Sequence, residues 1–164
     1  MLGEFSPFYA NKLLMKNVNS NFQLQRSLLP VLLMVLFLAA SCSTKIYFPE
    51  SPVVPGADPK AEVKKNKEGD YVVKLDVNNL ALPERLSPPK RNYVVWVNTE
   101  GQGVRNIGEL KNRRGMFSNS NRASFEGSIP LRPTQIFVTA ESTPDLQFPG
   151  DHTVLKSDVF RIKK

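Results

Sequence analysis

Tyr93-Val94-Val95-Trp96-Val97 is the stretch that decides the fold class of this chain. A nearly continuous run of β-branched and aromatic residues predicts a strand that is buried on both faces or lies at the centre of a sandwich. Six further short runs have strand-forming residues: 71–77, 104–110, 123–127, 135–140, 154–155 and 159–162. No 3.6-residue periodicity of any length is present, and 13 prolines and 9 glycines argue against long helices. About seven short strands predict an all-β fold, an antiparallel β-sandwich over residues 61–164.

The segment before this domain is rich in proline. Residues 43–60 read STKIYFPESPVVPGADPK and contain four prolines. Such a segment favours extended backbone, so we expect residues 42–60 to form a semi-rigid tether with a reach of roughly 55 Å. The alternative is that Ile46-Tyr47-Phe48 packs on the domain as an edge strand.

Further towards the N-terminus, Leu28 to Cys42 reads LLPVLLMVLFLAASC and follows the basic residues Lys12, Lys16 and Arg26. The apolar run from Leu28 to Ala40 would span only roughly 20 Å as a helix, against about 30 Å of bilayer hydrocarbon. A charged start, an apolar centre and small residues at the end are typical of a secretory signal peptide. We therefore expect residues 1–41 to be removed, with Met15 as an alternative start.

Ala39-Ala40-Ser41-Cys42 resembles the lipobox of bacterial lipoproteins. This resemblance implies that Cys42 is acylated on sulfur and becomes the new N-terminus, which would anchor the protein in membrane lipid. Two or three acyl chains hold a protein firmly, whereas one holds it only marginally. Ser43 resembles the residue choice of lipoproteins that are sorted to the outer membrane, so we expect a lipid-anchored protein there. Simple signal-peptide cleavage and an uncleaved anchor are the alternatives.

The domain carries a second resemblance. It is similar to the extracytoplasmic C-terminal domain of anti-sigma-K factors in three stretches, 93–97 (YVVWV), 106–110 (NIGEL) and 137–141 (FVTAE). The match covers roughly residues 70–162 and implies an immunoglobulin-like sandwich. Residues 1–27 are too short for the helical domain with which an anti-sigma factor binds its sigma factor. The resemblance therefore concerns the outer module, and it implies no catalytic residues.

Charge narrows the class of partner. The whole chain has a net charge of +7, and the part from residue 42 onward has 19 basic and 14 acidic residues. A basic balance favours anionic partners, and export makes nucleic acid an improbable one. Lys111, Arg113 and Arg114 lie in the stretch KNRRGM, which has two interpretations: one is a loop that binds an anionic partner such as envelope polysaccharide phosphate or the membrane surface. The alternative for this stretch is an ordinary solvated loop.

Histidine and cysteine, which often act as metal ligands or catalytic residues, are scarce in this chain. The chain has one histidine, His152, and one cysteine, which the lipobox assigns to the anchor. A transition-metal site of the His/Cys kind is therefore not expected, and no cofactor is predicted. His152 lies in a turn-rich region without a nucleophile motif, so we interpret it as a solvent-facing loop residue. Trp96 belongs either to the sandwich core or to an exposed binding face.

Taken together, these patterns predict a non-catalytic envelope lipoprotein that acts as a binding or structural module. Its partners would be membrane lipid through acylated Cys42 and an envelope protein or anionic polysaccharide. The alternative function is a sensor or signalling component related to anti-sigma factor regulation.

Overall fold

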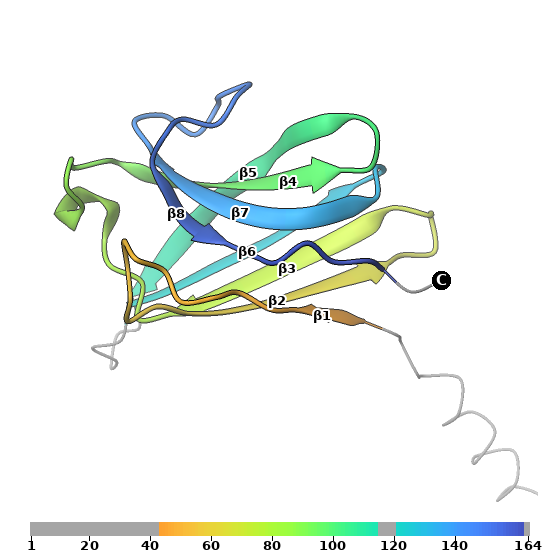
Figure 1. Cartoon of the computed structure of the whole chain (residues 1–164), viewed down its shortest axis with the longest axis horizontal. Coiled ribbons are helices and arrows are strands. Elements are labelled where there is room, and N and C mark those ends of the chain that lie inside the picture. Colours follow the sequence, from red (N-terminus) through yellow and green to blue (C-terminus); the bar gives the residue numbers. More distant parts are fainter. Residues whose placement is uncertain (1–42, 115–120, 163–164) are drawn as a thin grey trace, which may run out of the picture. The chain divides into compact units, whose positions relative to one another are not determined.

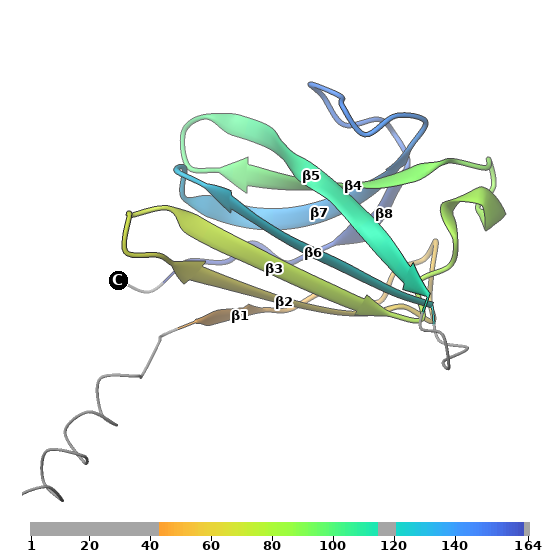
Figure 2. The same ribbon diagram turned by 180° about the vertical axis from the view of Figure 1, so that it is seen from behind.

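The computed structural model of the chain describes residues 43–114 and 121–162. These residues form one sheet of eight antiparallel strands that curls strongly (Figures 1 and 2). The strand order across the sheet is β1-β2-β3-β6-β5-β4-β7-β8. The strands are β1 (Thr44–Ile46), β2 (Asp58–Lys65), β3 (Tyr71–Asn78), β4 (Asn92–Thr99), β5 (Gly103–Arg114), β6 (Asn121–Ile129), β7 (Pro133–Glu141) and β8 (Thr153–Lys156).

The all-β, antiparallel prediction is confirmed. Within the described residues the only helical element is η1, a single 3-10 turn at Pro83–Arg85. Two details of the prediction were wrong. The stretch 159–162 is not a strand, and β1 and β2 bring the number of strands to eight.

Strand β4 is buried on both faces, as its run of apolar residues predicts. All five residues from Tyr93 to Val97 are at most 1% exposed. Tyr93, Val95 and Val97 face the main core, whereas Val94 and Trp96 belong to a second, smaller cluster. The main core fills the inside of the curl and takes residues from both halves of the sheet, among them Val63, Val73, Leu75, Leu110, Ile136, Val138 and Leu155.

Strand β5 joins the two halves of the sheet. Residues 103–110 pair with β4, and residues 111–114 pair with β6. Within residues 103–110 the register against β4 shifts at Val95/Trp96, which leaves Ile107 as an extra, bulged residue. Gly108 adopts a φ of +133° at this bulge. A Cβ at Gly108 would lie 2.9 Å from the Phe125 ring, so glycine leaves the space that the ring occupies.

The segment from β1 onward packs on the domain, as in the alternative interpretation of Ile46–Phe48, instead of forming the predicted semi-rigid tether. β1 pairs with β2, and Phe48 and Val54 are 8% and 6% exposed within the main core. The Ser51 hydroxyl donates to the Val154 carbonyl in β8, and the Asp158 N–H donates to the Tyr47 carbonyl at 3.2 Å. Residues 47–54 therefore lie across the gap between the two outermost strands of the sheet. The folded part of the chain therefore starts at about residue 44 instead of 61.

The predicted signal peptide 1–41, the alternative start Met15 and the anchor residue Cys42 lie outside the described residues. In the part of the chain that the structure does describe, no helix is long and apolar enough to cross a membrane.

Candidate functional site

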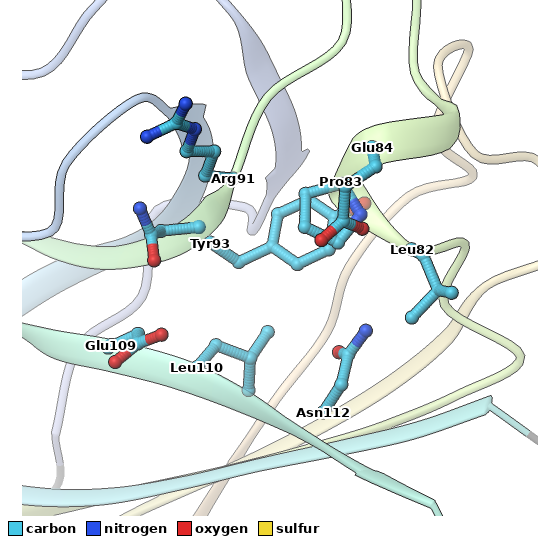
Figure 3. A pocket seen from close by; sticks show the side chains of 9 residues that line it. Leu82, Pro83, Glu84, Arg91, Tyr93, Glu109, Leu110 and Asn112 are labelled. Atoms are coloured by element: carbon cyan, nitrogen blue, oxygen red, sulfur yellow. The ribbon is translucent and has the colours of Figure 1, made fainter.

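A pocket of about 390 Å³ lies at one end of the sheet, where η1, the start of β4 and the end of β5 meet (Figure 3). We call this end the pocket end. Ligand sites are typically concave, with volumes of about 300–1,000 Å³, so this pocket is at the small end of that range. Its walls combine apolar, charged and amide side chains: Leu82, Pro83, Glu84, Arg91, Asn92, Tyr93, Glu109, Leu110 and Asn112.

Tyr93 forms the rigid wall of the pocket. Its ring is 1% exposed, and its hydroxyl donates a 2.8 Å hydrogen bond to the Ala81 carbonyl. The segment that carries η1 closes back on itself, because the Lys90 N–H donates to the Pro83 carbonyl at 3.0 Å. Burial raises the pKa of the Tyr93 phenol, and the nearby negative charge of Glu84 raises it further. The phenol therefore stays protonated and serves as a fixed wall rather than as a base.

Asn112 lines the pocket and has a side chain that makes no hydrogen bond within the described part of the structure. Both its amide nitrogen and its amide oxygen are buried, and neither has a hydrogen-bond partner among the described residues. In Figure 3 its side chain rises from β5 towards the middle of the pocket. A buried polar group without a partner costs about 1–3 kcal/mol.

Charged side chains of both signs surround the mouth of the pocket. Glu84 and Arg91 are exposed, and the Glu109 carboxylate lies 4.0 Å from the Lys111 ammonium. Such a rim can orient a small polar ligand by charge while Leu82 and Leu110 contact its apolar part. Across the described residues no group of three His, Cys, Asp or Glu side chains is placed to hold a metal ion.

The predicted anion-binding residues lie beside this pocket, but in a strand instead of a loop. Lys111, Arg113 and Arg114 belong to β5, because residues 111–114 pair with β6. In this register Arg113 is directly opposite Arg122. Asn112 lies between these basic residues and connects them to the pocket.

Trp96 is not on an exposed binding face. It is fully buried, its indole N–H donates to the Thr139 hydroxyl at 2.8 Å, and its ring stacks on Phe137 at 6.3 Å and 14°. It also lies outside the main core, in the smaller cluster on the opposite face of β4, against which Leu146 packs. The prediction that Trp96 lies in the central core is therefore wrong, because it lies in a second cluster with Val94 and Phe137.

Asn106, next to the bulge in β5, fixes the loop after β7 by hydrogen bonds. The Asn106 amide nitrogen donates to the carbonyls of Pro144 and Leu146, both at 2.9 Å, and its oxygen accepts from the Gly108 N–H at 2.9 Å. In the same region His152 is partly buried, with its Nε2 atom shielded and unpartnered among the described residues. The prediction of a freely solvated histidine is therefore wrong for that atom.

No family model, curated protein or solved structure matches this chain. The resemblances to lipoproteins and to anti-sigma-K factors therefore stay predictions.

Sequence reasoning did not find the pocket. Its residues come from three separate stretches, 82–84, 91–93 and 109–112, and none of these stretches has a recognisable motif. The only available signal was that Asn112 interrupts a basic run, which is a common pattern in solvated loops.

Proposed function

We propose that this protein is a lipid-anchored lipoprotein of the bacterial cell envelope, held at the outer membrane by acyl chains on Cys42. The observation that carries this proposal is the apolar run from Leu28 to Ala40, which ends in small residues directly before the single cysteine. In such a protein the folded domain would follow the anchor directly, because β1 begins at Thr44, two residues after that cysteine.

We further propose that the domain is an immunoglobulin-like β-sandwich that serves as a non-catalytic binding module. The curl of the sheet supports a two-layer description, with one layer around β2, β3 and β6 and the other around β4 and β7 (Figure 1). The pocket beside Tyr93 and Asn112 is the proposed ligand site. The basic residues Lys111, Arg113 and Arg114 next to it favour an anionic ligand, such as phosphate-bearing envelope polysaccharide or an acidic face of an envelope protein.

The position of the pocket supports this role. The chain enters the domain beside the β2–β3 turn, because Thr44 pairs with Val63. The pocket lies at the other end of the sheet, where Tyr93 pairs with Leu110. In both views of the fold the entry of the chain and the η1 segment lie at opposite ends (Figures 1 and 2). A protein anchored at Cys42 would therefore present the pocket away from its membrane.

Metabolic labelling with palmitate, combined with membrane fractionation, tests the anchor. We expect the wild-type protein to carry label and to fractionate with membranes, and the Cys42→Ser variant to lose the label. An unlabelled wild-type protein would refute the lipoprotein assignment.

Binding of inorganic polyphosphate to the purified protein tests the anionic site. Because the contact is electrostatic, affinity should fall with added salt and in the variant with Lys111, Arg113 and Arg114 all replaced by Gln. The matched control replaces Lys60, Lys74 and Lys156, which are exposed lysines elsewhere on the sheet. Equal loss in both triple variants would show a general charge effect and would refute a specific site.

A further inference from the structure

The register of β1 shows where the chain enters the domain. Thr44 is opposite Val63 in an antiparallel pair, so the start of β1 lies beside the end of β2 that leads into the β2–β3 turn. Cys42 precedes Thr44 by two residues in the sequence. Two residues of chain reach at most about 7 Å, so the acylated cysteine must lie close to this hairpin.

The β2–β3 turn beside this position is well ordered by hydrogen bonds. The Asn66 N–H donates to the Asp70 carbonyl at 2.8 Å, and the Asn66 side-chain oxygen accepts from the Asp70 N–H at 2.8 Å. Gly69 provides the positive φ of +98° that the turn requires. The turn therefore holds Lys67 and Glu68 at a fixed position beyond the ends of the two strands.

Three exposed lysines surround this turn: Lys64, Lys65 and Lys67. The Lys65 ammonium lies 5.7 Å from the centroid of the Tyr71 ring, which keeps its side chain against the hairpin. Glu68 and Asp70 are the acidic residues of the same turn. The hairpin thus keeps a positive excess of one charge next to the point where the chain enters.

Other elements meet at the same end of the sheet, which we call the entry end. The turns after β4 and β6 lie together here, because the Glu100 N–H donates to the Arg132 carbonyl at 3.0 Å. The Arg132 guanidinium pairs with the Glu100 carboxylate at 3.7 Å and also donates to the Ile162 carbonyl, which brings the last described stretch, with Asp158 and Arg161, to this end. These two pairs of opposite charges balance, so the positive excess at the entry end is that of the hairpin lysines.

We propose that the entry end, led by Lys64, Lys65 and Lys67, binds the anionic headgroups of the membrane that carries the acyl anchor. This inference rests on the proposed lipoprotein function, because the anchor is what brings the hairpin to the membrane surface. Basic residues near an anionic surface strengthen membrane binding roughly five-fold each. The contact would fix the orientation of the domain, since a flexible tether of useful length is absent between Cys42 and β1.

Fluorescence quenching in reconstituted vesicles tests this orientation. The acylated protein has no free cysteine, so Glu68→Cys or Asp145→Cys provides one labelling site, at the entry end or in the loop after β7. Each labelled protein is placed in vesicles of phosphatidylcholine with phosphatidylglycerol that contain a nitroxide-bearing headgroup as quencher. We expect several times stronger quenching at the Glu68→Cys site than at the Asp145→Cys site.

The contribution of charge is tested with two triple variants. Replacing Lys64, Lys65 and Lys67 by Gln should abolish most of the difference in quenching between the two sites, as should vesicles of phosphatidylcholine alone. Replacing Lys60, Lys74 and Lys156 by Gln removes the same charge elsewhere and should leave the difference unchanged. Equal quenching at both sites, or a difference that survives loss of the three hairpin lysines, would overturn the inference. Failure of the lipoprotein assignment would instead be seen as absence of acylation in the purified protein.

Discussion

Replacing Phe48 by Ala gives a direct test of whether residues 47–54 belong to the folded domain. Phe48 is 8% exposed and contributes to the main core, whereas its neighbour Tyr47 is 70% exposed. The two residues are adjacent aromatic side chains in one segment, so Tyr47→Ala is a matched control. A free tether would make both changes equally silent.

The expected magnitude follows from burial. Truncation of a buried phenylalanine to alanine costs about 3–5 kcal/mol, and a segment at the rim of the sheet can relax, which favours the lower value. We therefore expect Phe48→Ala to lower the free energy of unfolding by about 3 kcal/mol. For a domain of this size that corresponds to a fall in Tm of roughly 10 °C or more. Tyr47→Ala should stay within about 0.5 kcal/mol of the wild type.

Urea unfolding of the purified chain, followed by tryptophan fluorescence, measures both effects. Trp96 is fully buried, so its emission reports on the loss of the sheet. We expect the midpoint of Phe48→Ala to fall with little change in the slope m, because the fold stays the same. A midpoint shift for Phe48→Ala no larger than that for Tyr47→Ala would refute the packing of this segment on the domain.

Three further predictions concern the sheet and the pocket. Gly127→Ala places a Cβ 2.5 Å from the Phe125 ring, so it should lower the free energy of unfolding by about 1–3 kcal/mol, measured by urea unfolding. Adding Phe125→Leu to the same chain should recover part of that loss. Asn106→Ala removes three hydrogen bonds at the bulge and should lower the free energy of unfolding by about 2–3 kcal/mol. Its control is Asn92→Ala, which loses one exposed hydrogen bond to the same loop and should lower the free energy of unfolding by less than half as much. Because the folded-state pKa of Tyr93 is raised, its contribution to stability is complete below the unfolded pKa of about 10 and decreases as the pH rises above it. Thermal unfolding between pH 8 and 11 should show a steeper alkaline loss of Tm for wild type than for Tyr93→Phe, and equal slopes would contradict the raised pKa.

The strands that could be predicted from the sequence are those in which the order of apolar and polar residues matches the burial of each side chain. Residues 93–97 and 135–140 are apolar enough to require burial on two faces, and residues 71–77 alternate between core and solvent. Strand β2 was missed because only Ala61 and Val63 mark its inner face, between lysines and a glutamate on the outer face. Its stability comes from pairing with β1 and β3 on either side, which no local pattern reports.

The same limit explains the basic stretch and the pocket. The stretch from Lys111 to Arg114 is a strand because β5 leaves β4 and continues along β6, which is a pairing between distant segments. The composition of KNRRGM indicates solvent exposure but not the backbone conformation. The pocket depends on this crossing, since Asn112 lies just beyond the last residue of β5 that pairs with β4. A site made where a strand changes partners is therefore not recognisable from sequence alone.

The packing of residues 44–54 also changes the height at which an anchored domain would work. An extended tether over residues 43–60 would carry the domain up to roughly 55 Å from the bilayer. Because β1 starts two residues after Cys42, the height of the pocket above the bilayer would instead be set by the length of the sheet. Strands β2, β3 and β4 each have eight residues. At about 3.3 Å per residue, eight residues span roughly 26 Å, so the pocket would lie within about 30 Å of the headgroups. If the proposed anchor is present, a ligand or partner of this pocket would itself have to approach the membrane surface, and polymers and proteins that lie against that membrane would be favoured over partners that require a long reach.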